Sequence, residues 1–152
     1  MSLTIRLATD DDVSNLRAWN AAMAWETEHR RLDETVLERG VRGVLAQPRR
    51  GFYLVAEREG VAVGGLLVTY EWSDWRNGDF WWIQSVYVIP AARRGGVFRA
   101  LHAEVNRRAR EAGAVGVRLY VETENERAQA TYTQLGMQRC PYWMYETDFT
   151  AA

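Results

Sequence analysis

The pattern of apolar and polar positions in the first third of the chain predicts one strand followed by two helices. Residues 3–8 alternate between apolar and polar, as in a half-buried strand. Thr9-Asp10-Asp11-Asp12 then supplies capping side chains and acidic residues for a helix start. We expect this helix to loosen over residues 25–28, Asp33 to cap the second helix, and residues 47–48 to end it. Apolar residues at helical spacing mark the two helices: Val13, Leu16, Trp19 and Met23, then Val36, Leu37, Val41, Val44 and Leu45.

The pattern then changes to that of strands. Residues 52–57 and 62–70 flank Arg58-Glu59-Gly60, which is typical of a hairpin turn. Asn77-Gly78-Asp79 predicts a second turn, and a long aromatic and β-branched strand follows it up to Pro90. The expected elements from there on are a strand over 80–89, a helix over 96–112, a strand over 115–121, a helix over 125–135 and a strand over 142–149.

These elements predict one α/β domain covering residues 1–152, in the order β-α-α-β-β-β-α-β-α-β. The meander of strands should be antiparallel, whereas the strand-helix-strand unit over 80–121 requires a parallel, right-handed crossover. The result is a mixed sheet with helices on both faces, a three-layer α-β-α arrangement. Within the long strand, regular alternation places Ser85, Tyr87 and Ile89 on the face opposite to Gln84, Val86 and Val88.

Composition excludes several classes of protein. With 47% apolar and 26% charged residues among 152, the chain is globular, and its net charge of −1 gives no basic field for nucleic acid or an anionic membrane. Cys140 is the single cysteine, and His29 and His102 lack metal-binding spacing, so we expect neither a disulfide nor a metal site. The first residues lack the pattern of a signal peptide, and we expect a cytoplasmic protein.

The most informative segment runs from Val86 to Phe98. A buried strand ends at Pro90, and a short loop with Arg93, Arg94, Gly95 and Gly96 leads directly into a helix that no Ser, Thr, Asp or Asn caps. Uncapped amides at a helix start carry partial positive charge, and glycines let a phosphate approach them. The alternative interpretation is a tight turn with solvated arginines. Neither a P-loop nor a dinucleotide-binding glycine motif is present.

This segment resembles the coenzyme A pyrophosphate loop of the GCN5-related N-acetyltransferases (GNAT), [R/Q]xxGx[G/A]. Arg93 and Gly96 match the pattern, whereas Phe98 stands where a small residue is usual. A second motif, NxxAxxxYxxxG followed by an apolar residue, matches at Asn125, Ala128, Tyr132, Gly136 and Met137. The two motifs occur in the correct order with a predicted strand between them.

The resemblance implies an acetyl-CoA-dependent N-acetyltransferase that works by direct transfer and needs no metal. It implies that Tyr132 protonates the departing thiolate, although a phenol on this helix face is also typical of a core aromatic. Asn125 is either a helix cap or a contact to the cofactor. The further cofactor-binding residues implied by the resemblance are Val86, Tyr87, Val88, Arg93, Arg94, Gly95, Gly96, Val97, Phe98 and Ala128. The amide of Val86 or Val88 is the expected oxyanion donor.

The acceptor side is less determined by the sequence. The attacking amine must lose a proton, and Glu26, Glu28 and Glu71 are the candidate bases, with Glu26 and Glu71 preferred. Four of the seven tryptophans lie within residues 70–82, which indicates either packing and a homodimer contact or an aromatic pocket for a small amine. The hypotheses that compete with a small-molecule acetyltransferase are a non-catalytic acyl-CoA sensor and an acetyltransferase acting on protein.

Overall fold

The computed structural model describes residues 2–150. The chain divides into two compact units, Met1–Tyr120 and Val121–Ala152. Among the described residues, the first contains a five-stranded sheet and three α-helices, and the second contains one α-helix. The elements are β1 (Leu3–Leu7), η1 (Asp10–Asp12), α1 (Val13–Glu28), α2 (Glu34–Ala46), β2 (Gly51–Arg58), β3 (Val61–Ser73), β4 (Gly78–Val88), η2 (Pro90–Ala92), α3 (Val97–Glu111), β5 (Gly116–Arg118) and α4 (Glu126–Gln134).

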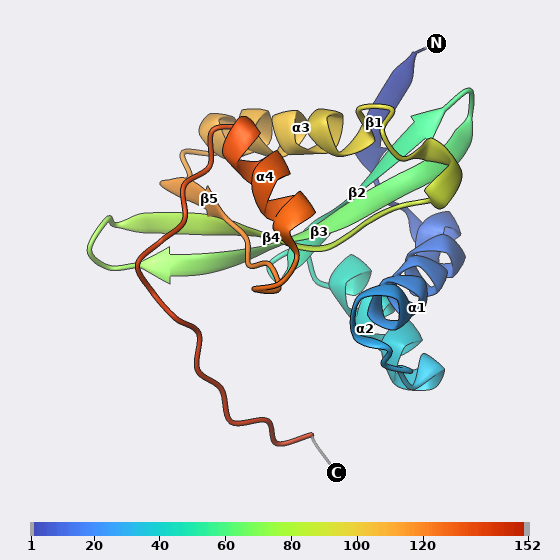
Figure 1. Cartoon of the computed structure of the whole chain (residues 1–152), viewed down its shortest axis with the longest axis horizontal. Coiled ribbons are helices and arrows are strands. Elements are labelled where there is room, and N and C mark those ends of the chain that lie inside the picture. The colour runs from blue at the N-terminus through green and yellow to red at the C-terminus, as the bar shows by residue number, and fades with distance from the viewer. Residues whose placement is uncertain (1, 151–152) are drawn as a thin grey trace. The chain divides into compact units, whose positions relative to one another are not determined.

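The sheet has the order β1-β2-β3-β4-β5 (Figure 1). The first three pairings are antiparallel, and β4 pairs with β5 in parallel through α3, as predicted. β5 is shorter than the predicted strand over 115–121, because its ladder with β4 has only three pairs, from Phe80–Gly116 to Trp82–Arg118. After Trp82 the described residues of β4 pair only with β3. The parallel strands therefore separate partway along β4.

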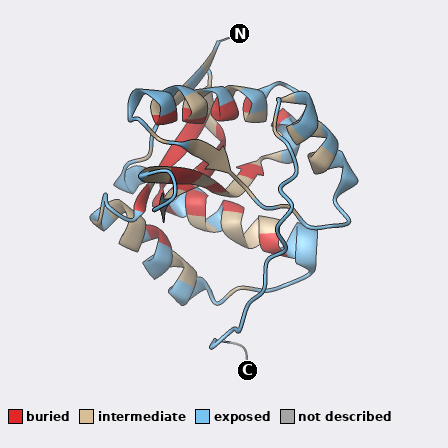
Figure 2. Cartoon of the chain, turned by 90° about the vertical axis from the view of Figure 1, so that its left-hand side faces the viewer, coloured by how far each residue is buried: buried red, intermediate tan, exposed pale blue. Residues whose placement is uncertain are grey.

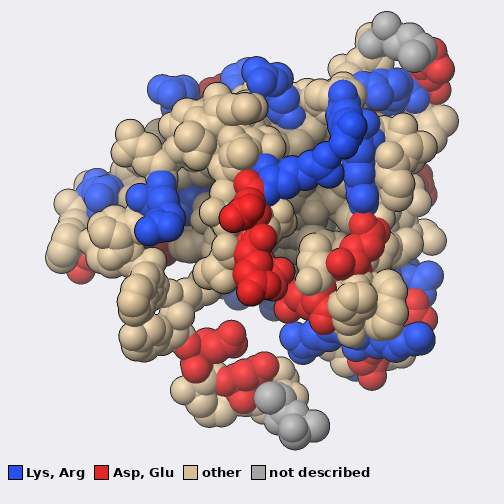
Figure 3. Space-filling view, viewed as in Figure 1, with Lys and Arg blue, Asp and Glu red and all other residues tan. Residues whose placement is uncertain are grey.

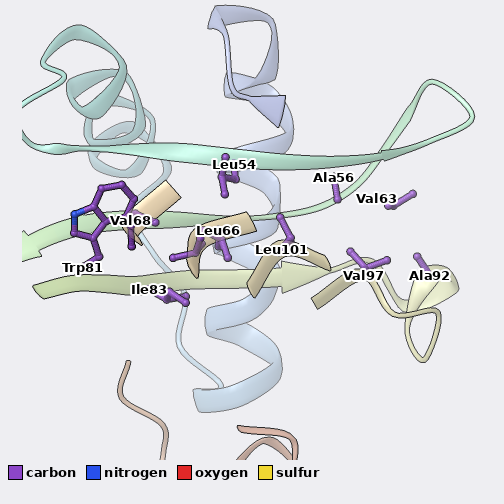
Figure 4. Packing of buried hydrophobic residues seen from close by; sticks show 12 residues of the cluster. Leu54, Ala56, Val63, Leu66, Val68, Trp81, Ile83, Ala92, Val97 and Leu101 are labelled. Atoms are coloured by element: carbon purple, nitrogen blue, oxygen red, sulfur yellow. The ribbon is translucent and has the colours of Figure 1, made fainter. Parts of the chain in front are cut away.

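Helices cover both faces of this sheet. α3 presents Val97, Leu101 and Val105 to one face, where they pack with residues of β2, β3 and β4 (Figure 4). α1 and α2 cover the other face with Trp19 and Val41 among others. Figure 2 shows the buried positions concentrated on the strands and on the helix faces turned toward them. Within residues 2–150, no helix combines the length and the apolar character needed to cross a membrane.

Two expectations for the first helices were wrong. α1 does not loosen over residues 25–28 but continues to Glu28, where His29 adopts a left-handed conformation with φ 50° and ends the helix. Val36 is not in the buried stripe of α2, since 68% of it is exposed. Asp33 does cap α2, accepting hydrogen bonds from the amides of Thr35 and Val36.

A β-bulge in β4 overturns the predicted alternation. Ser85 has φ 52°, and the pairing of β4 with β3 shifts by one residue between Leu67–Gln84 and Gly65–Tyr87. An extra residue reverses the faces of everything that follows it. Val86 and Val88 therefore pack on the α3 side with Ile83, and Tyr87 packs on the α1 side. The alternation holds on each side of Ser85 but not across it.

The second unit contains α4 and an extended segment. The predicted final strand over 142–149 is absent; Tyr142, Trp143, Tyr145 and Phe149 are all more than 70% exposed. Alternation of apolar residues favours a strand only where a neighbour supplies a hydrogen-bonded ladder, and the sheet formed by the described residues contains only β1–β5. α4 itself matches the prediction, beginning after Asn125 and ending one residue before Leu135.

Candidate active site

The loop between β4 and α3 contains two left-handed residues close to the start of the helix. Arg94 and Gly96 both adopt left-handed conformations, with φ 68° and 79°. Gly96 is the N-cap of α3 and provides no side-chain cap, as the sequence predicted. Turns that mix right- and left-handed residues direct successive N–H groups to one side, where they attract anions.

Three amides at the end of this loop are uncommitted. Among residues 2–150, the N–H groups of Gly95, Gly96 and Val97 donate to no protein acceptor. A Cβ atom added at Gly96 would meet no heavy atom within 4 Å, so the space beside it is open. The residues present therefore fit a phosphate group at the start of α3, where the helix dipole adds favourable electrostatics.

Arginines surround this turn. Arg58, at the end of β2, donates from Nη2 to the carbonyl oxygen of Gly95 at 3.0 Å. The Arg94 and Arg99 side chains are exposed, and within the described residues neither makes an ion pair or a hydrogen bond. In Figure 3 basic side chains lie along the upper edge of the view, over α3 and the loop before it. Arg58 was missed by the sequence analysis, since 37 residues separate it from Gly95 and no motif links them.

Arg93, the first residue of the loop motif, is differently placed. Its Nε donates to the carbonyl oxygen of Val88 at 2.9 Å, and its Nη2 lies 2.8 Å from Glu26 Oε1. The guanidinium carbon is also 5.3 Å from the centroid of the Tyr87 ring. The side chain is therefore held by β4 and by the last turn of α1.

Glu26 receives a second donor from the same strand. The Tyr87 hydroxyl donates to Glu26 Oε2 at 2.5 Å. The hydrogen bonds from Tyr87 and then Arg93 lower the pKa of Glu26 below its ordinary value. Burial, followed by the bond to Glu26, raises the pKa of Tyr87. A carboxylate stabilised in this way binds a proton weakly, which makes Glu26 a poor proton acceptor.

Glu71, the other preferred base, lies elsewhere on the sheet. Its Oε1 accepts hydrogen bonds from Trp82 Nε1 and from Arg118 Nη1, each at 2.9 Å. On β4, Trp82 bonds to Glu71 and Tyr87 bonds to Glu26. These two aromatic residues are five positions apart, which corresponds to roughly 16 Å of strand. The structure therefore does not bring Glu26 and Glu71 to the same point.

Beyond Trp82, the edge of β4 that faces away from β3 carries the backbone N–H groups of Val86 and Val88. The N–H of Ile89 donates to Val63 of β3 at 2.9 Å. Because successive N–H groups of a strand alternate between its two sides, those of Val86 and Val88 point away from β3. That is the side from which β5 has already separated.

Phe98 departs from the motif without filling the loop. Its ring centroid lies 5.9 Å from that of His102, one helical turn further along α3. Ring pairs at i and i+4 are neighbours on a helix surface. The bulky side chain is therefore accommodated along the helix.

The second motif is explained largely by the ends of α4. Asn125 Oδ1 accepts from the amide of Ala128 at 3.1 Å, which is a helix N-cap. At the other end Gly136 has φ 90°, and the amides of Gly136 and Met137 donate to Thr133 and Tyr132, a Schellman motif. Of the two roles open to Asn125, the structure shows the cap.

Tyr132 lies on the half-buried face of α4. Ala128 and Leu135, which share this face, are half-buried as well. Burial raises the pKa of the Tyr132 phenol above its ordinary value. The phenol is therefore fully protonated at neutral pH and is able to act as a donor.

Comparison with known proteins agrees with these features. The model of the acetyltransferase (GNAT) family matches residues 8–137. A comparison with curated protein sequences finds no match. Among solved structures, one described as a possible acetyltransferase from Clostridium difficile 630 is 43% identical, with a TM-score of 0.91 over 99% of this chain and 100% of that one.

Two more distant structures share the fold. A predicted acetyltransferase from Clostridium acetobutylicum, solved with acetyl-CoA, has 17% identity and a TM-score of 0.79 over 96% of each chain. AAC(6')-Iy, solved with the bisubstrate analogue CoA-S-monomethyl-acetylneamine, has 20% identity and a TM-score of 0.77 over 97% of this chain and 99% of that one. With the family model spanning both motifs and the 43%-identical relative covered from end to end, this chain belongs to the GNAT family of acetyltransferases.

Proposed function

We propose that this protein transfers an acetyl group from acetyl-CoA to the nitrogen of a primary amine by direct attack. The observation that carries the proposal is the open turn at Gly96, whose uncommitted amides and neighbouring arginines suit the diphosphate of coenzyme A. Two structures with the same fold were solved with acetyl-CoA or a CoA bisubstrate analogue. Membership of an acetyltransferase family supports the reaction class.

Acetyl-CoA supplies the activated thioester, and the chain's own residues position it. The N–H groups of Gly95, Gly96 and Val97 take the diphosphate, with Arg94 adding charge. The edge of β4 at Val86 and Val88 takes the pantetheine as an added strand. One of these two amides donates to the thioester oxygen, which becomes negative as the amine attacks.

Two proton movements complete the transfer. The nitrogen–carbon bond forms as the carbon–sulfur bond breaks, so the amine nitrogen loses a proton and the thiolate gains one. We assign the second proton to Tyr132, whose burial keeps the phenol protonated. For the first, Glu71 suits better than Glu26, because within the described residues its Oε2 has no hydrogen-bond partner.

The surroundings of Glu71 favour a small amine as the acceptor. Trp82 and Tyr120 form an aromatic pair with centroids 6.1 Å apart, and Arg118 stacks on Phe80 beside them. Aromatic faces next to a carboxylate oxygen attract an ammonium group carried on an apolar body. A homodimer and a cytoplasmic location stay predictions.

The test is a panel of primary amines incubated with acetyl-CoA, read by release of free thiol. We expect turnover on at least one amine, together with a dissociation constant for CoA measurable by calorimetry. Binding of CoA without turnover on any amine would favour the acyl-CoA sensor instead.

A second arm separates small-molecule from protein acceptors. Cell lysate is incubated with labelled acetyl-CoA, and label in protein is measured beside label in small amines. All 19 basic residues of the chain are arginine, so self-acetylation on lysine adds no background. Label confined to protein would overturn the assignment of a small-molecule acceptor.

A further inference from the structure

The Arg93 side chain connects three elements that the motif by itself does not relate. Arg93 follows η2 in the chain. Its side chain donates hydrogen bonds to Val88 at the end of β4 and to Glu26 in the last turn of α1. A guanidinium presents its donors in a rigid, planar fork. Two of its three nitrogens are occupied by these contacts, and the plane lies near the Tyr87 ring.

The charge of Arg93 is also largely compensated. Glu26 lies 2.8 Å away and is held as a carboxylate by two donors, so the local pair is close to neutral. Arg94, the next residue, has no such partner among residues 2–150. Of these two adjacent arginines, Arg93 is therefore paired with an acidic side chain and Arg94 is not.

Resting on the proposed function, we propose that Arg93 is a positioning residue that ties the diphosphate loop to α1 through Glu26, and that Arg94 supplies the charge for the diphosphate. The tether holds the turn at Gly96 in its open, left-handed form before the ligand arrives. Arg58 braces the other side of the turn through the carbonyl of Gly95. Preorganised amides bind an anion without the cost of ordering a loop.

The same contacts assign Glu26 a structural role. It faces Tyr87 from β4 and Arg93 from the loop, and both bonds stabilise its charged form. If Glu26 loses its negative charge, it loses the ion pair that holds Arg93 in place. Glu26 is thus a positioning residue for the cofactor loop.

Glu26→Gln shows whether Arg93 is a tether or a phosphate ligand, because the two roles predict opposite changes in the affinity for CoA. If Glu26 only restrains an arginine that binds phosphate, removing the carboxylate frees a positive charge and tightens CoA binding. If Arg93 is a tether, the variant weakens CoA about 3- to 10-fold in spite of the added positive charge. Calorimetric titration with CoA measures the sign, and tighter binding by Glu26→Gln would overturn the proposal.

Two further variants complete the design. Arg93→Gln should weaken CoA at least as much as Glu26→Gln, because it also leaves the Glu26 carboxylate uncompensated. The double variant should be no worse than Arg93→Gln alone, because both substitutions remove the same contact. Arg94→Gln is the matched comparison: it should weaken CoA and flatten the dependence of affinity on salt, whereas the double variant Glu26→Gln/Arg93→Gln, which leaves the net charge unchanged, keeps the parent's salt dependence. Additive effects of Glu26→Gln and Arg93→Gln would contradict the tether.

Readouts other than affinity separate this proposal from the proposed function. The amides of Ala92 and Ala100 donate to Ile89 and Gly96, so they report opening of the loop and of the first turn of α3. Their hydrogen exchange in the free protein should quicken in Glu26→Gln and Arg93→Gln but not in Arg94→Gln. The acidic limb of kcat/KM against pH should be unchanged in Glu26→Gln, as expected for a group that is not the base. A parent that fails to bind CoA would refute the proposed function, while unchanged exchange in the variants would refute the tether alone.

Discussion

The side-chain oxygen of Asn125 accepts a hydrogen bond from the backbone N–H of Ala128 at 3.1 Å. The first half of the second motif is therefore one helix cap, and its end is a second cap built on Gly136 and Met137. Both caps fix where α4 begins and ends. The caps use the side chain of Asn125 and the backbone of the other motif residues. Tyr132 is the motif residue whose side chain can donate a proton, which makes it the candidate for chemistry.

Tyr132→Phe should lower kcat about 100-fold and leave the dissociation constant of CoA within about twofold of the parent, because a general acid acts on the departing thiolate and not on ground-state binding. Steady-state kinetics and calorimetry measure the two quantities. Tyr145→Phe, at an 87% exposed position of the same unit, is the control and should keep the parent's rate. Equal kcat values for Tyr132→Phe and the parent would remove the phenol from the mechanism.

Gly96→Ala should weaken CoA at least 10-fold, since the added methyl group enters the open space beside the amides where we propose that the diphosphate binds. Gly113→Ala is a matched control at the other end of α3, with φ 78° against 79° and an equally open site. Both variants should lose about 1 kcal/mol of stability from the left-handed conformation. Thermal unfolding gives that cost, and comparable CoA affinities of the two variants would argue against a ligand at Gly96.

Asp12→Ala should destabilise the protein by about 2 kcal/mol, because a nearly buried carboxylate holds both Arg6 and the amide of Thr9. Urea unfolding measures the change. Asp11→Ala, exposed in the same turn, is the control and should stay within about 0.5 kcal/mol of the parent. The hydrogen bond from Arg6 lowers the pKa of Asp12, so this stabilisation is present above pH 3.8 and fades as the pH falls further.

The free energy of unfolding should fall as the pH is lowered below about 6.5, through His102. Burial lowers the pKa of this imidazole in the folded protein, so the unfolded chain binds the proton first and gains stability from it. Urea midpoints over a pH series measure the slope. His102→Gln should flatten it; a parent whose stability is level between pH 5 and 7 would disprove the coupling.

Local patterns determined most of the elements of this protein. The caps at Thr9, Asp33 and Asn125 and the turn at Gly60 depend on residues within a few positions of one another, and all are present in the structure. The two motifs likewise combine short-range signals, so they identified the loop before α3 and the helix that carries Tyr132. The helix that crosses from β4 to a parallel β5 follows from connection rules that depend only on element order.

Tertiary structure decided what depends on distant partners. The bulge at Ser85 reverses the faces of Val86 and Tyr87 because β3 lacks a matching residue, and the alternating residues 142–149 form no strand because pairing requires a neighbour. Arg93 was expected at the cofactor from its place in a motif, yet its side chain is held by Glu26, 67 residues away. Sequence spacing determines which groups lie on one helix or turn; which cation meets which anion depends on how the packed elements bring them together.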